Sequence, residues 1–223
     1  KMGLELSNIY KEYKINGDNE IQSVLNGVNL TITDGEMIAI MGKSGAGKST
    51  LLHIIGLLDI CDQGTYKLDG EDISDFTNKQ RAKIRNEKIG FVLQDFGLVE
   101  DETVMENVSL PLMLSRTSMK KIREVALEKM KKVGVEHLSN KKVSVLSGGE
   151  KQRVAIARAL VCDPEYIMAD EPTGALDSVN AEKIMLILSS LNKEGKTVII
   201  VTHDETVAKK CGRIITIKDG KIE

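Results

Sequence analysis

Residues 37–50 read MIAIMGKSGAGKST and decide the fold. Residues 37–41 form a continuous apolar run, which is typical of a strand buried on both faces. Residues 42–49 match the pattern G-x-x-x-x-G-K-[ST], and residues 48–57 predict a helix directly after the glycines. Glycines let backbone N–H groups turn towards phosphate oxygens, and a helix N-terminus adds its positive end. The order strand, glycine-rich loop, helix therefore predicts a phosphate-binding loop.

Two side chains of this loop have separate expected tasks. Lys48 can bring its ammonium to the outer phosphates, and Ser49 can offer its hydroxyl to Mg²⁺, which prefers oxygen ligands. The alternative, a glycine turn with no ligand, is disfavoured by the strand before it and the helix after it. The expected phosphate contacts are Gly42, Lys43, Ser44, Gly45, Ala46, Gly47, Lys48, Ser49 and Thr50.

Two adjacent acids end a later apolar run, residues 166–169. We expect Asp170 to hold Mg²⁺ through its water shell and Glu171 to act on the attacking water, as general base or by orientation. A solvated strand end would explain the two acids as well. The phosphate-binding loop upstream favours the catalytic interpretation.

The composition is that of an ordinary globular protein, with 223 residues, 41% of them hydrophobic and 29% charged. A net charge of -2 gives no general attraction to nucleic acid, and we expect no such partner. Cys61, Cys162 and Cys211 show no pairing or metal-ligand spacing, which predicts free thiols. No apolar window of about 18 residues and no signal peptide is evident, so we expect a cytoplasmic protein.

Hydrophobic patterns predict alternating strands and helices over the rest of the chain. Such alternation implies a mostly parallel sheet covered by helices. We expect one domain, 1–223, in which residues 1–93 and 162–223 build a nucleotide-binding core and 94–161 form a helical insertion. The expected strands are 28–32, 37–41, 65–68, 89–93, 166–169, 197–201 and 213–218, and the expected helices are 48–57, 119–133, 147–161 and 180–191.

Residues 146–152 read LSGGEKQ and open the last helix of the insertion. Ser147 supplies a hydroxyl, while Gly148 and Gly149 allow close backbone approach at a helix N-terminus, so the segment is itself a candidate anion site. A plain helix cap and turn is the alternative. A single chain that holds phosphates at residues 42–49 has no evident need for a second such site.

The phosphate loop, LSGGEKQ and a strand ending in Asp170-Glu171, in this order, resemble the ATP-binding cassette (ABC) ATPases over residues 4–223. The resemblance implies an α/β fold with a RecA-like P-loop NTPase core, a mostly parallel sheet, an N-terminal antiparallel β part and a helical subdomain. It also implies a head-to-tail homodimer that sandwiches ATP with Mg²⁺ and no other metal. In that dimer Ser147, Gly148 and Gly149 close on the γ-phosphate bound by the partner.

The resemblance also assigns roles to four isolated residues. Gln94 resembles the glutamine that contacts Mg²⁺ and water, and His203 the histidine that hydrogen-bonds the γ-phosphate. Asp177 resembles the acid that crosses the dimer seam, although it would also suit a helix N-cap. Tyr13 is the expected aromatic platform for adenine, with Tyr10 as a competitor.

Two further stretches, ADEPTGALDS at 169–178 and NVSLPL at 107–112, are similar to a branch that serves lipoprotein release and the efflux of macrolides or antimicrobial peptides. We therefore expect an ATPase that powers export through a separate membrane permease, peripheral on the inner face of the membrane. A regulatory or mechanotransmission module acting on a membrane partner without transport is the alternative. LSGGEKQ argues against a soluble kinase. Lys43 stands where relatives commonly have Pro, and Glu150 where they commonly have Gln.

Overall fold

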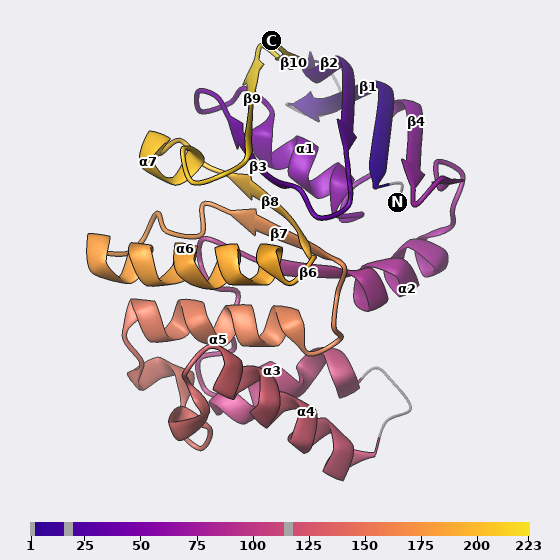
Figure 1. Ribbon diagram of the computed structural model, residues 1–223. Coiled ribbons are helices and arrows are strands. Elements are labelled where there is room, and N and C mark those ends of the chain that lie inside the picture. Colours follow the sequence, from indigo (N-terminus) through magenta and orange to yellow (C-terminus); the bar gives the residue numbers. More distant parts are fainter. Residues whose placement is uncertain (1–2, 16–19, 114–117) are drawn as a thin grey trace.

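The computed structural model describes residues 3–15, 20–113 and 118–223. Within these residues the strands form two sheets, which Figure 1 shows with the helices around them. One sheet has four strands in the order β2-β1-β4-β5, and the other has six in the order β10-β9-β3-β8-β7-β6. This arrangement is the α/β fold with a mostly parallel sheet that the sequence predicts.

The six-stranded sheet carries the chemistry-bearing residues at one edge. Its strands are β3 (Met37–Met41), β6 (Ile89–Val92), β7 (Tyr166–Asp170), β8 (Thr197–Val201), β9 (Arg213–Lys218) and β10 (Lys221–Ile222). The first five run parallel and β10 pairs antiparallel with β9. The carboxyl ends of parallel strands meet at one edge, where α/β proteins bind ligands. The residues after β3, β6, β7 and β8 therefore come together.

The antiparallel sheet covers the amino-terminal part of the sequence and was expected there. Its strands are β1 (Leu4–Ile15), β2 (Glu20–Ile32), β4 (Gln63–Leu68) and β5 (Glu71–Asp72). Helix α1 (Lys48–Ile55) lies between the two sheets, as Figure 1 shows, and buries Leu51, Leu52, Ile54 and Ile55 against both. This shared core fixes β1 over the start of α1.

A group of helices covers the opposite face of the parallel sheet. Helix α6 (Ser178–Lys193) and helix α5 (Gly148–Leu160) run side by side below the sheet, and α3 (Val104–Met113) and α4 (Met119–Lys132) pack beyond α5 (Figure 1). Two short 3-10 turns, Glu136–Leu138 and Val143–Val145, connect α4 to α5. A second hydrophobic core joins these helices to β7 and β8.

Some helices lack the periodic apolar residues by which a helix is predicted from sequence. Helix α2 (Asn78–Lys88) buries only Arg81, so no apolar stripe marks it; a Thr77 capping box with Gln80 starts it instead. Helix α3 contains Pro111, and α7 (Glu205–Ala208) spans four residues. Helix α1 ends at Ile55, two residues earlier than expected, because Leu57 adopts a left-handed conformation with φ 59°.

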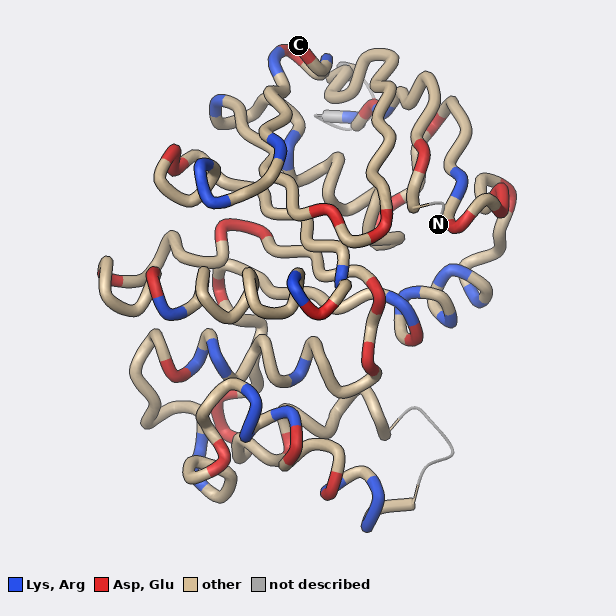
Figure 2. The backbone as a smooth tube through the Cα atoms, viewed as in Figure 1, with Lys and Arg blue, Asp and Glu red and all other residues tan. Residues whose placement is uncertain are grey.

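Charge is spread over the whole fold, and Lys and Arg are interspersed with Asp and Glu on most elements (Figure 2). Helices α2 and α4 carry more basic than acidic side chains. Across the described ranges, every helix is too short or too polar to cross a bilayer.

Candidate active site

A cavity of about 800 Å³ lies at the carboxyl edge of the parallel sheet. It is where the loop after β3, the ends of β6 and β7 and the residue after β8 converge, with β1 and β2 along one side. Most of the predicted site residues line it, namely Tyr13, Gly42, Lys43, Ser44, Gly45, Gly47, Lys48, Ser49, Thr50, Gln94, Asp170, Glu171 and His203. Sequence reasoning missed three further lining residues, Gln22 and Val24 of β2 and Val201 at the end of β8.

The phosphate-binding loop needs glycine where it meets α1. Gly47 has φ 100°, and a Cβ there would lie 2.8 Å from the Val24 carbonyl oxygen. Because Gly47 is also the N-cap residue, no side chain caps the helix. The first amides of α1 therefore have no side-chain acceptor, which suits them to an anion at this end of the cavity.

The Lys48 ammonium is held inside the loop. Its Nζ donates to the carbonyl oxygens of Gly42 and Lys43, both at 2.9 Å. The loop thereby curves around its own cation, beside the cavity.

Asp170 and Ser49 face each other across the cavity floor. The Ser49 hydroxyl lies 3.5 Å from Asp170 Oδ1, at the limit of a hydrogen bond. Burial raises the pKa of Asp170, and the hydrogen bond from Ser49 opposes that rise. With the Gln94 amide, these groups form an oxygen-rich set of the kind that Mg²⁺ shares with phosphate and water.

These donors fit Mg²⁺ better than they fit a metal enclosed by protein alone. In the described part of the chain, no cluster of three or more His, Cys, Asp or Glu side chains is arranged to hold an ion. An ion at Ser49 and Asp170 would therefore complete its coordination with the bound phosphates and with water.

Glu171 is held from three directions at the end of β7. Its backbone N–H donates to the Val201 carbonyl at 2.9 Å, and its φ of 46° lies in the left-handed region, which costs energy for a non-glycine residue. Its carboxylate accepts from Thr202 Oγ1 at 3.2 Å and lies 2.7 Å from His203 Nδ1. The Glu171 side chain is 14% exposed and the His203 side chain is 72% exposed, so the pair joins a sheltered carboxylate to an imidazole at the surface.

Tyr13 and Tyr10, the two competing aromatics, lie in different places. Tyr13 lines the cavity, whereas Tyr10 lines a separate depression with Asn26 and residues of β9 and β10. The register of β1 with β2 sets Tyr13 opposite Gln22, which is also at the cavity. The geometry favours Tyr13 for an aromatic contact with a ligand.

The LSGGE segment does not line this cavity, and the polar groups of its serine form hydrogen bonds within α5. Ser147 caps α5: its backbone N–H and its hydroxyl both donate to Glu150 Oε2, at 2.8 and 2.7 Å, and the Glu150 N–H returns to Ser147 Oγ at 3.4 Å. These hydrogen bonds lower the pKa of Glu150. Gly149 packs closely against Asn180, because a Cβ there would lie 2.6 Å from Asn180 Oδ1 and the Asn180 side chain would have to shift. Gly148 precedes it at the first position of α5.

Asp177 also has the capping role that the sequence left open. Its two carboxylate oxygens accept from the Asn180 backbone N–H at 2.8 Å and from the Asn180 side chain at 2.7 Å, and they cap α6. These contacts lower the pKa of Asp177. Asp177 does not line the cavity.

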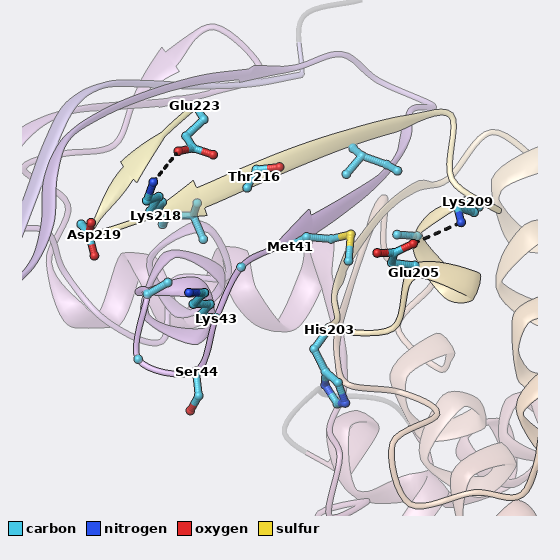
Figure 3. A pocket seen from close by; sticks show the side chains of 16 residues that line it. Met41, Lys43, Ser44, His203, Glu205, Lys209, Thr216, Lys218, Asp219 and Glu223 are labelled. Atoms are coloured by element: carbon cyan, nitrogen blue, oxygen red, sulfur yellow. Dashed lines mark hydrogen bonds and ion pairs between the residues drawn. The ribbon is translucent and has the colours of Figure 1, made fainter.

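Ala46 is buried and faces a neighbouring cavity of about 980 Å³, which Figure 3 shows. This second cavity lies between the phosphate-binding loop, α7 and β9. Lys43 and His203 line both cavities. The ion pairs Glu205–Lys209 and Lys218–Glu223 lie on its far sides.

A loop shaped for phosphates, an oxygen-rich ion site and a sheltered carboxylate at one edge of a parallel sheet define a P-loop nucleotide hydrolase. The family model described as ABC transporter matches residues 25–174, and the chain belongs to this family of ATP-binding cassette ATPases.

The relatives are similar over nearly the whole chain. The uncharacterized ABC transporter ATP-binding protein YvrO of Bacillus subtilis is 50% identical over 98% of this chain and 95% of its own length. The lipoprotein-releasing system ATP-binding protein LolD of Pseudoalteromonas translucida is 44% identical over 98% and 94%. The macrolide export ATP-binding/permease protein MacB of Chlorobaculum tepidum is 47% identical over 98% of this chain, which spans 33% of MacB.

A solved structure gives the same picture of the fold. The dimeric post-hydrolysis state of the ATP-binding cassette MJ0796, bound to ADP and Pi, superposes with a TM-score of 0.90 at 47% identity. It covers 99% of this chain and 96% of that one.

Proposed function

We propose that this chain is the ATP-hydrolysing subunit of an exporter, which works as a homodimer beneath a separate membrane permease. The names of LolD and MacB support export as the type of work, and the joint name of MacB supports a permease as the partner. In this proposal the protein lies at the inner face of the membrane, held there by its permease.

One observation carries the proposal. The cavity that holds the phosphate loop, Gln94, Asp170, Glu171 and His203 is not lined by Ser147, Gly148, Gly149 or Asp177. Two anion-binding elements of one chain thus lie at different places. A second copy, turned head to tail, can place its α5 N-terminus over the first copy's cavity, and the dimeric MJ0796 structure supports such an assembly.

The residues of the cavity then share the work of hydrolysis. Tyr13 stacks on adenine, the loop amides and Lys48 bind the β- and γ-phosphates, and Glu171 orients and deprotonates the attacking water. Bound Mg²⁺ supplies charge neutralisation at the phosphates, held by Ser49, Gln94 and Asp170. His203 is exposed enough to turn from Glu171 to the γ-phosphate without unpacking its neighbours.

Hydrolysis changes the charge that holds the two copies together. The γ-phosphate lies between Lys48 of one copy and the α5 N-terminus of the other, so its release removes an anion shared by both. The dimer then opens. Closure and opening are the movements that the permease receives.

The permease contact is proposed at a small apolar cavity of about 380 Å³ on the side of the molecule. Leu58, Phe91 and Pro111 are among its lining residues, and they come from both sides of the joint between the nucleotide-binding core (1–93 and 162–223) and the helical part (94–161). Arg158 also lines it and donates to the carbonyls of Phe96 and Gly97, just after Gln94. A permease segment bound in this cavity would contact both the nucleotide-binding core and the helical part, so a movement of one relative to the other would displace it.

The shared site is tested by Glu171→Gln. This change keeps the shape of the side chain and removes its basicity, so MgATP binds but is not cleaved. We expect the variant to run as a dimer in gel filtration with light scattering when MgATP is present, and as a monomer with MgADP.

The matched control is Glu171→Gln combined with Lys48→Ala, which should stay monomeric in both nucleotides because the phosphate charge is not held. A Glu171→Gln chain that remains monomeric at saturating MgATP would contradict the shared site.

A further inference from the structure

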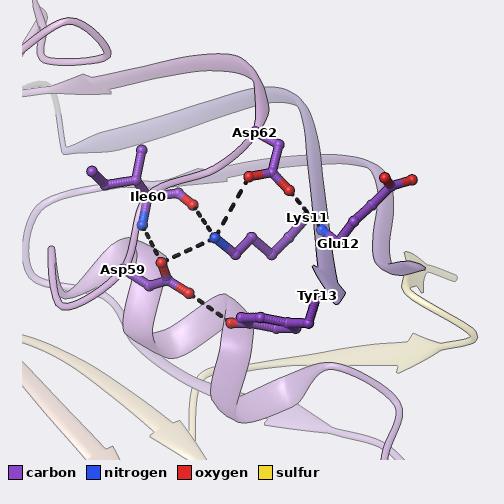
Figure 4. Close-up of polar contacts among 6 residues, drawn as sticks. All are labelled: Lys11, Glu12, Tyr13, Asp59, Ile60 and Asp62. Atoms are coloured by element: carbon purple, nitrogen blue, oxygen red, sulfur yellow. Dashed lines mark hydrogen bonds and ion pairs between the residues drawn. The ribbon is translucent and has the colours of Figure 1, made fainter. Parts of the chain in front are cut away.

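Four charged or aromatic side chains form a cluster beside the cavity, beyond the phosphate loop. Lys11 and Tyr13 come from β1, and Asp59 and Asp62 come from the turn after α1; these four are called the strand–turn cluster here (Figure 4). Only Tyr13 among them lines the cavity. The other three lie behind it.

Tyr13 is held at its hydroxyl and along one face. The phenol donates to Asp59 Oδ2 at 2.6 Å, and the Lys11 ammonium lies 5.0 Å from the centroid of the ring. Figure 4 shows the ring nearly edge-on, with Lys11 on one side of its plane. Tyr13 is nevertheless 39% exposed, which leaves room for a flat ligand against it.

Asp59 is itself fixed and cannot follow Tyr13 freely. Its Oδ1 accepts from Lys11 Nζ at 3.0 Å and from the Ile60 backbone N–H at 2.7 Å. The Lys11 side chain is only 10% exposed, and its ammonium also donates to the Ile60 carbonyl at 2.7 Å. A cation this sheltered needs a nearby carboxylate, so Lys11 and Asp59 hold each other in place.

The protonation states agree with this geometry. Burial raises the pKa of Tyr13, and the hydrogen bond to Asp59 raises it further, so the phenol remains a donor at neutral pH. Burial also acts to raise the pKa of Asp59, but the hydrogen bonds from Tyr13, Ile60 and Lys11 outweigh it and hold that pKa below its usual range. Asp59 is therefore a charged acceptor for a neutral phenol.

The turn does not need Tyr13 in order to stay in place. Asp62 accepts from the Glu12 backbone N–H at 2.7 Å, and its own N–H donates to the Tyr10 carbonyl at 2.9 Å. These two bonds already attach the turn to β1. The contact between Asp59 and the Tyr13 hydroxyl is thus additional to the attachment, and it acts on the one member of the cluster that lines the cavity.

We propose that Asp59 and Lys11 are positioning residues that fix the Tyr13 ring as a preformed platform for the purine base. This inference rests on the proposed role of Tyr13. Lys11 covers one face of the ring and leaves the other for the base, while Asp59 stops the ring from turning. A ring ordered before binding loses less conformational freedom when the base stacks, and this favours affinity for the nucleoside part alone.

The experiment compares two ligands on the full chain, MgADP and Mg-pyrophosphate, by titration calorimetry. Pyrophosphate contacts the loop but offers no base. We expect Asp59→Ala to weaken the affinity for MgADP about three- to tenfold, which is equivalent to one net hydrogen bond. The affinity for Mg-pyrophosphate should not change. Glu12→Gln, an exposed carboxylate on the same strand, is the matched control and should change neither ligand.

Tyr13→Phe provides a second variant that leaves Asp59 and Lys11 paired. It keeps the ring and removes the hydroxyl, so we expect the same loss of MgADP affinity as in Asp59→Ala. Asp59→Ala should add little further loss of MgADP affinity in the Tyr13→Phe background, because the hydrogen bond between Asp59 and the Tyr13 hydroxyl is already absent there. A merely structural effect of Asp59 would weaken both ligands and would add to that of Tyr13→Phe.

Each outcome decides one question. Unchanged MgADP affinity in Asp59→Ala and Tyr13→Phe, or equal losses for MgADP and pyrophosphate, would overturn the positioning role. Tyr13→Ala separates this failure from a failure of the proposed platform. If Tyr13→Ala weakens the affinity for MgADP but Asp59→Ala does not, only the positioning role of Asp59 is rejected. If Tyr13→Ala binds MgADP normally, the role of Tyr13 as a platform for the base is rejected as well.

Discussion

Glu171, the proposed general base, is held in place by its backbone and by its neighbours. Its left-handed backbone (φ 46°) turns the chain away from β7 directly after the last strand residue, and its N–H is still bonded to Val201 of β8. The carboxylate is then held by Thr202 and His203 at the neighbouring strand end. Strain of this kind persists only where the surroundings fix it, and here two adjacent strands do so.

The sequence indicates Glu171 and His203 separately but not their contact. Each follows a buried strand, which is a local pattern. Their 2.7 Å contact depends on β7 and β8 lying side by side, and this follows from the sheet order rather than from either segment. Thr202 carries no signal at all, since a threonine at a strand end is common; only the structure shows that it is buried and donates to Glu171.

Lys48 is the residue whose loss should affect turnover most simply. Lys48→Ala removes the cation that the loop carbonyls of Gly42 and Lys43 hold beside the cavity. We expect phosphate release from MgATP to fall about a hundredfold or more, which is typical when one charge-stabilising group is lost. Lys83→Ala, which removes a 73% exposed ammonium on α2, is the charge-matched control and should hydrolyse ATP normally. Near-normal turnover in Lys48→Ala would remove the loop from the mechanism.

At the scale of elements, the helices near the site differ in whether a side chain caps their N-terminus. Helix α5 has the Ser147–Glu150 capping box and α6 has Asp177, whereas α1 begins at Gly47 with no side-chain cap. The helix with the phosphate loop thus keeps its amides for a ligand. Helices α5 and α6 have capped N-termini, and these N-termini carry the residues that the proposal places at the partner's nucleotide.

The elements that the sequence predicts best are those with a local pattern. Strand β3, the loop and α1 are read directly from residues 37–55, and β8 and β9 have the expected limits. Strand β1 was missed because its register with β2 shifts at several points, which breaks the alternation of faces. Helix α2 was missed because it packs through a buried arginine rather than an apolar stripe.

The α5 capping box gives a prediction on pH. Hydrogen bonds from Ser147 lower the pKa of Glu150 below its ordinary value of 4.5 in the folded chain. The unfolded chain therefore binds the proton more readily, and this contribution to stability is complete above pH 4.5 and is lost as pH falls through the lower, folded-state pKa. Glu150→Gln should lower the urea midpoint near pH 7 and have a smaller effect near pH 3.

The comparison of the two proteins across that range isolates Glu150 from the other carboxylates. A parallel offset between the wild type and Glu150→Gln at every pH would contradict the pH-dependent part of the cap. Glu124→Gln on the exposed side of α4 is the control and should follow the wild type throughout.

At the scale of the whole molecule, the two segments that the proposed dimer would bring together lie in different places of one chain. The cavity lies at the sheet edge, and the α5 N-terminus lies in the helical part below it. LSGGEKQ and the loop indicated both segments in the sequence, but their separation within one copy depends on how α5 packs against α6 and β6.

Mixing two inactive variants tests this arrangement. Ser147→Arg blocks the α5 N-terminus, and Lys48→Ala disables the phosphate loop, so either variant alone should lack turnover. A heterodimer of the two contains one intact composite site, in which the loop of the Ser147→Arg chain meets Ser147 of the Lys48→Ala chain. We expect the mixture to recover MgATP hydrolysis in proportion to the heterodimer, measured as phosphate release. Absence of recovery in a mixture shown to form heterodimers would contradict the composite site.

The capping box has a consequence for how such a site can close. The Ser147 hydroxyl has a single proton to donate, and within the chain it donates its hydrogen bond to Glu150 Oε2 at 2.7 Å. In the proposed dimer an incoming phosphate competes with a carboxylate for the same donor. Joining the two copies would then be an exchange of acceptors, in which the Ser147 hydroxyl turns from the Glu150 carboxylate of its own chain to the phosphate bound by the other copy.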